Sequence, residues 1–291
     1  EEKKPENVIP RVRALLGQGV EFDLEWVSVY TFACMRMEKF RHGRVLFAGD
    51  AAHGVSPFGA RGANSGVQDA DNLCWKLAMV LRGEASEKLL DTYGEERELA
   101  ADENILNSTR STDFITPKNH ASKIFRDAVL SLAKEHPFAR RLVNSGRLSL
   151  PSTYQASSLN TADSEIFDSA MCPGAPASDA PIRLASGEQD WFVQLLGDKF
   201  SAVVFADDYQ AIENLPDATV WQVLAPKAAS QAKHDRVIID CEGLLAKRYD
   251  ARPGTTYLFR PDQHVAARWR EFNEINIQAA LHKASLQGMT P

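Results

Sequence analysis

The spacing of apolar residues predicts mainly helices in the first half of the chain. Apolar side chains recur every three or four residues over 5–20 and again over 64–82, so each set would share one face of a helix. The apolar face of the second helix would consist of Val67, Ala70, Leu73, Leu77 and Val80. Gly83 is a natural C-terminal stop for that helix. Between the two helices, alternating apolar and polar residues over 21–32 predict a strand.

Two more helices are predicted before residue 140. The first would be capped by Ser86 and broken at Thr116–Pro117, because a proline disfavours the helical conformation of the residue before it. The second would end near Pro137. Residues 149–180 are poor in aliphatic residues and rich in Ser, Ala and Pro, which is typical of a long connector on the surface of its neighbours.

The last part of the chain, 181–291, predicts a compact α/β unit in which strands alternate with helices and a hairpin comes late. Pro261-Asp262 would form the turn of that hairpin. The predicted strands cover 201–206, 219–224, 236–240, 256–260 and 264–269. The predicted helices lie near 191–196, 210–214 and 269–283.

Residues 43–78 join a short apolar strand to a loop rich in glycine and proline, and then to the 64–82 helix. Gly49-Asp50 follows the strand, which places a carboxylate at the edge of the sheet where open α/β sheets bind ligands. The start of the helix presents backbone N–H groups, which favour a negatively charged or electron-rich ligand group. The order of these parts therefore predicts a ligand site.

The same stretch resembles the second FAD-binding motif of the class A flavoprotein monooxygenases, the aromatic hydroxylases that include phenol hydroxylase and p-hydroxybenzoate hydroxylase. The matching residues are Gly49, Asp50, Ala51, Ala52, His53, Pro57, Gly59, Gly62, Asn64, Gly66, Asp69, Ala70, Asn72, Leu73, Trp75, Lys76 and Leu77. Arg61 departs from the pattern, because the family usually has a small or amide residue there.

The resemblance implies cofactor-binding roles for the loop. Asp50 would accept hydrogen bonds from the ribityl hydroxyls of FAD, and its alternative role is that of a turn or helix-cap aspartate. Four loop residues would direct backbone N–H groups at N1 and O2 of the flavin ring, where reduced flavin carries negative charge. They are Gly59, Gly62, Ala63 and Asn64. Alternatively these residues only form a tight turn, with Asn64 as a helix cap.

The other conspicuous residues receive more modest roles. The carbonyl of Pro57 would face the flavin ring and the substrate, or Pro57 would simply stiffen the loop. Phe58 would either line the pocket or pack in the core. His53 is expected to pack or to form a hydrogen bond rather than act as a base. Catalytic residues stay unknown, and no metal site is predicted. Asp69, Asn72, Trp75 and Lys76 would fix the helix against the sheet, and Arg260, Asp262 and Arg268 would make surface or interdomain contacts.

The glycine-rich turn GxGxxG, which holds the FAD pyrophosphate in this family, does not occur in the chain. The resemblance therefore implies the C-terminal part of a hydroxylase that alone binds FAD poorly or not at all and is inactive. The predicted fold class is α/β. Residues 1–148 would be the C-terminal part of the FAD and substrate domain with a helical extension, 149–180 a connector, and 181–291 a thioredoxin-like domain. The phrase PGTTYLFRPDQHVAARW resembles the end of that domain, whose redox CxxC motif is absent.

The implied function is hydroxylation of a phenolic or other aromatic substrate with O₂, FAD and NAD(P)H. Two alternatives are another flavoenzyme with the Gly-Asp motif, such as a halogenase, and a structural or dimerisation module. A net charge of −6 argues against nucleic acid as a partner, and no apolar run is long enough for a membrane span. Four scattered cysteines favour reduced thiols in the cytoplasm. The expected partner is a second copy of the chain, in a homodimer, or the missing N-terminal part of the protein.

Overall fold

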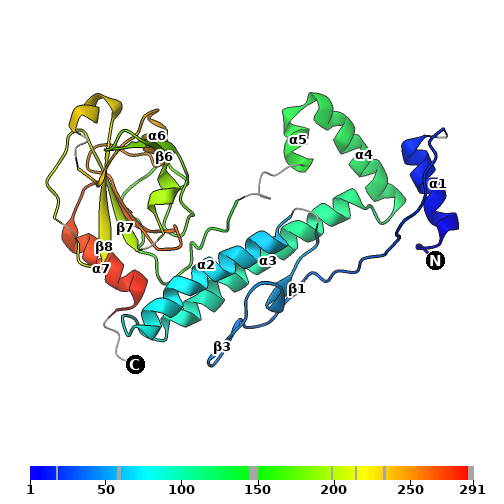
Figure 1. Ribbon diagram of the computed structural model, residues 1–291, viewed down its shortest axis with the longest axis horizontal. Helices are drawn as coiled ribbons and strands as arrows, with labels where there is room; N and C mark the ends of the chain where they lie inside the picture. Colours follow the sequence, from blue (N-terminus) through cyan, green and yellow to red (C-terminus); the bar gives the residue numbers. More distant parts are fainter. Residues whose placement is uncertain are drawn as a thin grey trace.

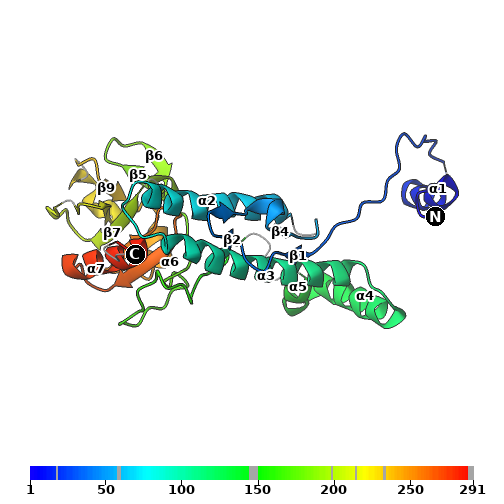
Figure 2. The same cartoon turned by 90° about the horizontal axis from the view of Figure 1, so that it is seen from below.

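The computed structural model is elongated (Figures 1 and 2). A C-terminal α/β unit lies at one end, a long pair of helices runs through the middle, and the first helix lies at the other end. The structure describes residues 1–17, 19–57, 60–143, 150–197, 199–213, 215–231 and 234–287. Within these ranges, no helix combines the length and the apolar character needed to span a bilayer.

The N-terminal region consists of one helix, an extended segment and two small β-ribbons. Its elements are α1 (Pro5–Leu16), β1 (Met35–Arg36) paired with β4 (His53–Gly54), β2 (Arg41–His42) paired with β3 (Val45–Leu46), and the 3₁₀ turn η1 (Gly49–Ala51). The strand predicted over 21–32 is wrong, since these residues form no strand. A strand is stabilised by hydrogen bonds to a neighbouring strand, and no described strand pairs with this segment. Trp26 and Tyr30 are accordingly 81% and 79% exposed.

Two long helices lie side by side in the middle of the molecule (Figure 2). They are α2 (Gly62–Leu81) and α3 (Leu89–Ile115). Gly83 ends α2 as predicted, with a φ of 73° and a hydrogen bond from its N–H to the carbonyl of Val80. The cap predicted at Ser86 is wrong, because Lys88 takes the N-cap position of α3.

The buried face of α2 is mainly polar, although an apolar face was predicted, and of the predicted residues Leu73 and Val80 pack against apolar clusters. Its buried residues are Ser65, Asp69, Asn72, Lys76 and Met79. Val67, from the predicted apolar face, is 69% exposed. The helix lies against α3, whose side chains supply charged partners rather than an apolar surface. The spacing of polar residues therefore marks the buried side of this helix.

The helical pair continues into two shorter helices, α4 (His120–Glu135) and α5 (Pro137–Val143). The helix that was predicted to end near Pro137 is confirmed as α4. The side chain of Asn119 caps it by accepting a hydrogen bond from the N–H of Ser122. The pattern of apolar residues gave no prediction of α5, which follows after a single residue.

The C-terminal unit is built on a seven-stranded sheet in the order β11-β10-β7-β8-β9-β5-β6. Strands β7, β8 and β9 are parallel, and the remaining neighbours are antiparallel. The strands are β5 (Pro181–Leu184), β6 (Gln189–Trp191), β7 (Phe200–Ala206), β8 (Ala218–Leu224), β9 (Val237–Ile239), β10 (Thr256–Phe259) and β11 (Val265–Trp269). The other elements are the 3₁₀ helices η3 (Phe192–Leu195) and η4 (Pro226–Gln231), and the helices α6 (Leu244–Arg248) and α7 (Glu274–Ser285).

Every residue of the central strand β7 is buried, because both faces of the sheet are covered. Ala202 and Val204 pack on one face with Leu281 of α7, and Phe205 packs on the other with Leu245 of α6. The five predicted strands are confirmed, whereas β5, β6 and α6 were not foreseen. The helix predicted over 210–214 is wrong for its described residues, 210–213, which form no helix. The helix predicted to begin at 269 begins instead at Glu274.

The connector predicted over 149–180 contains no helix or named strand in its described part, 150–180. It lies along the edge strand β11, where the N–H of Thr161 donates to the carbonyl of Ala266 and the N–H of Gly174 to that of Val265. Tyr154 and Leu159 of this segment are themselves buried. The segment therefore ties the C-terminal sheet to the helical pair. The division into domains, including the thioredoxin-like assignment, stays a prediction.

Candidate functional site

A cavity of about 610 Å³ lies between the extended N-terminal segment and the start of α2. Its walls come from 30–33, 54–57 and 60–63, together with Asp50. Asp50 belongs to η1 and is exposed. The cavity thus brings together the carboxylate and the loop that the sequence motif predicted. Phe58 and Gly59 lie outside the described residues.

The start of α2 presents N–H groups at this cavity that have no backbone acceptor among the described residues. The first hydrogen bond of the helix runs from the N–H of Ser65 to the carbonyl of Arg61, at 2.8 Å. The N–H groups of Gly62, Ala63 and Asn64 precede that bond, and such groups bind electron-rich ligand atoms. Gly62 and Ala63 line the cavity, as Pro57 does. Asn64 is not the helix cap, because Arg61 holds that position and the Asn64 amide instead donates to the carbonyl of Ala60 at 2.8 Å.

Two glycines allow the turn that carries Asp50 to lie directly on α2. Gly49 has a φ of 59°, a conformation that L side chains rarely adopt. A Cβ built on Gly66 would lie 3.4 Å from the Cα of Gly49, tighter than an ordinary contact. The two backbones therefore approach each other closely, which explains why glycine occurs at both places.

Asp69 fastens this turn to the helix. Its carboxylate accepts hydrogen bonds from the N–H of Gly49 (2.9 Å), from Nε of Arg97 (2.5 Å) and, at 2.7 Å, from Nε2 of His53 when that nitrogen carries the proton. Burial raises the pKa of Asp69, but the hydrogen bond from His53 and the charge of Arg97 outweigh burial, and the pKa is lowered. His53 is buried and does not line the cavity. The expectation that His53 forms a hydrogen bond thus agrees with the geometry.

Arg97 extends the cluster away from the cavity. Its Nη1 donates to the hydroxyl of Tyr154 at 2.6 Å, and its Nη2 donates to the carbonyl and the hydroxyl of Ser65. Asn104 joins Ser65 to Arg61 at the start of α2. Its side-chain oxygen accepts a hydrogen bond from Arg61, and its amide nitrogen donates to the hydroxyl of Ser65. The sequence motif gave no indication of Arg97 or Tyr154, because each lies far along the chain from the residues that it holds.

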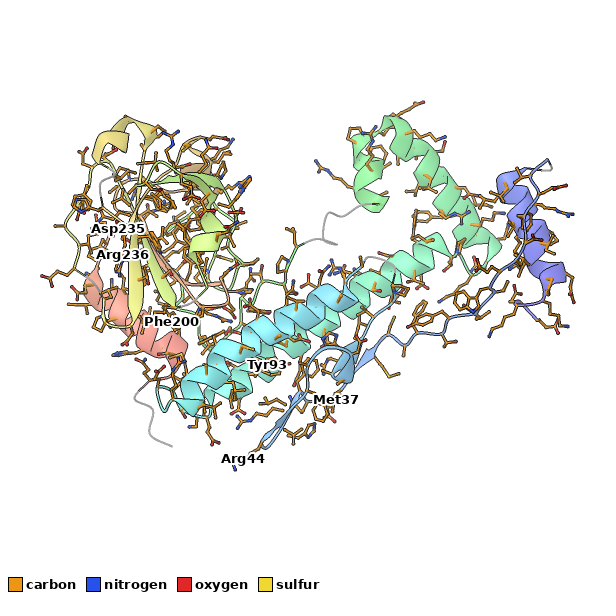
Figure 3. The ribbon with its side chains drawn as sticks, in the orientation of Figure 1. Met37, Arg44, Tyr93, Phe200, Asp235 and Arg236 are labelled. Atoms are coloured by element: carbon orange, nitrogen blue, oxygen red, sulfur yellow. The ribbon has the colours of Figure 1, made fainter. Side chains whose placement is uncertain are left out.

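Tyr93 on α3 adds another contact to the segment that leads into η1. Its hydroxyl donates to the carbonyl of Phe47 at 2.7 Å, and its ring packs against Phe40. Figure 3 shows Tyr93 on the part of α3 beside the β2–β3 hairpin. The segment before Asp50 is thus fixed to α3 as well as to α2.

A second buried cluster joins the helical pair to the C-terminal sheet. Glu96 of α3 forms a bidentate ion pair with Arg260, at 2.6 and 2.8 Å, and accepts a hydrogen bond from Lys76 at 2.8 Å. Arg260 also binds Asp262 in the turn after β10. Burial lowers the pKa of Lys76 to about 8, although the charge of Glu96 opposes the shift. Arg260 and Asp262 are buried, so the surface contacts predicted as one alternative are wrong, and Arg260 instead contacts Glu96 of α3.

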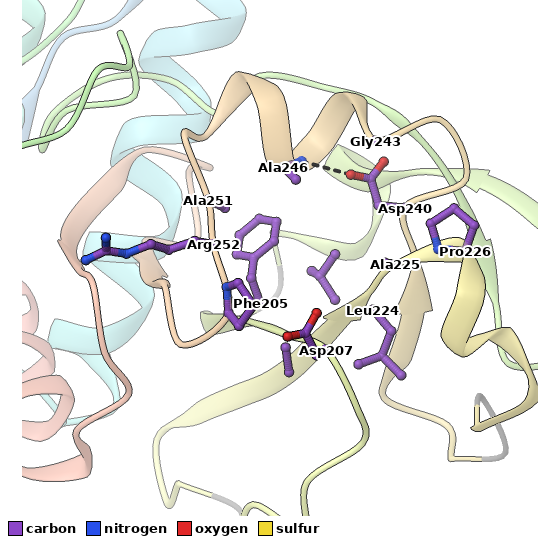
Figure 4. A pocket seen from close by; sticks show the side chains of 13 residues that line it. Phe205, Asp207, Leu224, Ala225, Pro226, Asp240, Gly243, Ala246, Ala251 and Arg252 are labelled. Carbon is purple, nitrogen blue, oxygen red and sulfur yellow. Dashed lines mark hydrogen bonds between the residues drawn. The ribbon is translucent and has the colours of Figure 1, made fainter.

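A smaller cavity of about 130 Å³ lies in the C-terminal unit, at the carboxyl ends of β7 and β8 (Figure 4). Asp240 at its edge accepts hydrogen bonds from the N–H groups of Leu245 and Ala246, and so caps α6. Asp240 therefore has its partners within the fold. In the described part of the chain, no group of three acidic, histidine or cysteine side chains could hold a metal ion.

Comparisons with known proteins agree with the motif. Residues 1–108 match the model of the FAD binding domain family. The chain is 31% identical to a 3-(3-hydroxy-phenyl)propionate/3-hydroxycinnamic acid hydroxylase of Mycolicibacterium gilvum, over 94% of this chain and 51% of that protein. It is 31% identical to a 4-methyl-5-nitrocatechol 5-monooxygenase of a Burkholderia species, over 96% and 50%. The chain thus spans about half the length of the curated relatives that it matches.

Solved structures share the fold. The flavin-dependent monooxygenase PieE, solved with FAD and substrate, matches with a TM-score of 0.71 at 20% identity, over 98% of this chain and 55% of that chain. Aklavinone-11 hydroxylase, solved with FAD and aklavinone, matches with a TM-score of 0.69 at 23% identity, over 98% and 51%. These likenesses show that the chain shares the fold of the corresponding parts of both structures.

Proposed function

We propose that this chain, a relative of the FAD-dependent aromatic hydroxylases, forms the ribityl and ring side of a flavin site in such an enzyme. The observation that carries the proposal is the juxtaposition of an exposed carboxylate, Asp50, with the N-terminus of α2 at one cavity of about 610 Å³. A ribityl chain offers hydroxyl donors, and a flavin ring offers electron-rich N1 and O2 atoms. These are the groups that a carboxylate and unsatisfied N–H groups bind.

The residues present fit the cofactor. Asp50 would accept hydrogen bonds from ribityl hydroxyls, and the N–H groups of Gly62 and Ala63 would hold the ring edge where negative charge develops. Pro57 would present its carbonyl to the cavity, and Gly59 and Asn64 would add their N–H groups to those of Gly62 and Ala63. Bound FAD would supply the redox and oxygen chemistry, with NAD(P)H as the reductant. The protein would bind and orient the cofactor.

The proposed substrate is a phenolic or other small aromatic compound. The relatives described above are a hydroxylase and a monooxygenase, which favours hydroxylation over halogenation. We further propose that the protein works in the cytoplasm, and that a second copy or an N-terminal part covers the exposed face that carries Trp26 and Tyr30.

The test is a titration of the 291-residue chain with riboflavin and with FAD, followed by flavin fluorescence. Weak but saturable quenching is expected with both ligands, since the chain alone is expected to bind FAD poorly. FAD should bind no more than a few-fold tighter than riboflavin, because the proposed contacts involve the shared ribityl chain and ring. Asp50→Asn should weaken binding roughly tenfold, the loss expected for a hydrogen bond to a charged group. Asp113→Asn, an exposed aspartate of α3, is the matched control and should change nothing. Quenching that does not saturate, or equal affinities for both variants, would overturn the proposal.

A further inference from the structure

A tyrosine of the connector reaches the cluster that holds the proposed flavin turn. The Tyr154 hydroxyl accepts a hydrogen bond from Nη1 of Arg97 at 2.6 Å. Arg97 in turn donates through Nε to Asp69, at 2.5 Å, and the other oxygen of Asp69 binds Gly49 and His53. Three side chains therefore lead from the connector to the turn that carries the exposed carboxylate.

The position of Tyr154 is itself tightly determined. Its N–H donates to the carbonyl of Gly174, and its own carbonyl accepts from the amide of Asn160 at 2.7 Å. A Cβ at Gly174, which has a φ of 90°, would lie 2.4 Å from the Tyr154 carbonyl oxygen. The Tyr154 ring stacks on His264 at 4.6 Å and lies beneath the guanidinium of Arg260. The C-terminal sheet thus holds the ring from one side while Arg97 binds its hydroxyl.

We propose that Tyr154 is a positioning residue for the flavin turn, acting through Arg97 and Asp69 to hold Gly49 and thereby Asp50. The inference rests on the proposed function of the turn. Arg97 has no exposed surface, so water does not replace a lost acceptor at Nη1. A buried guanidinium with an unsatisfied N–H shifts toward another acceptor, and Asp69 is bound to the same guanidinium. The consequence would be a looser turn at the cavity.

A phenol suits this position better than a carboxylate. Burial raises the pKa of Tyr154 to about 12, so its hydroxyl stays neutral. Arg97 and Asp69 already form a charge-balanced buried pair. A second carboxylate would compete with Asp69 for the guanidinium, whereas a neutral hydroxyl accepts a hydrogen bond and leaves the ion pair intact.

The test is amide hydrogen exchange of the wild type and of Tyr154→Phe, without any flavin. Exchange in peptides that cover 43–57 should become roughly tenfold faster, because the removed hydrogen bond involves a buried charge. Exchange in β7 should stay unchanged. The matched control is Tyr257→Phe, which also removes one buried tyrosine hydroxyl, bonded to the carbonyl of Tyr249. Tyr257→Phe should leave 43–57 unchanged.

A second variant, Arg97→Lys, keeps a positive charge beside Asp69 but removes the guanidinium that joins it to Tyr154. It should give the same local increase in exchange over 43–57. The inference is overturned if neither variant changes exchange there, or if β7 loses protection equally. Riboflavin titration separates the two proposals. A wild type that binds no riboflavin defeats the proposed function, while the exchange result still decides whether Tyr154 holds the turn.

Discussion

Replacing Glu96 by glutamine would remove the carboxylate that α3 contributes to the second buried cluster, which joins the helical pair to the C-terminal sheet. Glu96 is buried, and five hydrogen bonds from four side chains converge on it. The donors are Asn72, Lys76, Ser157 and both terminal nitrogens of Arg260. Glutamine keeps one acceptor oxygen, but its NH₂ group would face donors that it cannot bind. The variant therefore loses a charge and several bonds with little change in volume.

The size of the effect follows from the charges in the cluster. Lys76 and Arg260 are balanced by Glu96 and Asp262, so the variant leaves one uncompensated positive charge in the protein interior. Breaking a buried ion pair in this way costs about 3–5 kcal/mol. That is a large part of the roughly 5–15 kcal/mol by which proteins are stable. The melting temperature should fall by roughly 6–20 °C.

The pH dependence adds a second signature. Lys76 already has its pKa lowered to about 8 from 10.5, by burial, and loss of Glu96 lowers that pKa further. Between the folded and unfolded pKa values, the unfolded state binds more protons, so stability rises with pH. The pH range in which stability rises, between the folded and unfolded pKa values of Lys76, therefore begins at a lower pH in the variant than in the wild type. The difference in stability between the two proteins should therefore shrink between pH 7 and pH 9.

Thermal unfolding followed by circular dichroism is the assay, with Glu84→Gln as the control. Glu84 pairs with Arg82 on the surface, with similar bond lengths, so its replacement should leave the melting temperature nearly unchanged. The reasoning is refuted if Glu96→Gln lowers the melting temperature no more than Glu84→Gln does. It is refuted as well if the difference between variant and wild type stays constant from pH 7 to pH 9.

Two further predictions concern acid and a glycine. Burial raises the pKa values of Glu96 and Asp262, but the charge of Arg260 outweighs burial, and both pKa values are lowered. The two carboxylates therefore stabilise the folded protein fully above their unfolded-state pKa values of 4.5 and 3.8. This contribution to the free energy of unfolding is lost as the pH falls below those values. Urea midpoints should be steady from pH 5 to 7 and fall below pH 4.5, and Glu96→Gln should flatten that fall. Gly174→Ala should lower the free energy of unfolding in urea by more than about 2 kcal/mol, since it adds a clash to backbone strain. The control Gly187→Ala, at a φ of 89° in open space, should lower it by about 1–2 kcal/mol. Equal losses of stability in the two variants would contradict the clash.

The sequence predicted the elements whose pattern is local. The five C-terminal strands are runs of buried apolar residues between turn residues, and runs of this kind form strands wherever they pack. The loop at Gly49 and Gly62 was predicted because residues 43–78 resemble the second FAD-binding motif of the class A flavoprotein monooxygenases. The cavity brings together Asp50, Pro57, Gly62 and Ala63 of the predicted set. Their cofactor-binding roles stay proposals.

The errors concern features that depend on distant partners. A strand over 21–32 needs a neighbour, and alternation alone does not provide one. The buried face of α2 was misassigned because two sets of its residues recur with helical periodicity. Val67 and Leu77 belong to the apolar set, and Asp69 and Lys76 belong to the polar set, which is the buried one. Burial of the charged face is possible only because α3 supplies counter-charges, which lie 20 and 28 residues away in sequence.

The polar interface between α2 and α3 specifies one register of the two helices. Asp69 meets Arg97, and Lys76 meets Glu96. If α3 slipped by one turn, Asp69 would lie opposite Tyr93 or Ala101 in place of Arg97, and its buried charge would lose its counter-ion. Such a loss costs several kcal/mol, whereas apolar faces tolerate a slip at far lower cost. Because Asp69 also binds Gly49, the register of the helices and the geometry of the cavity are determined together.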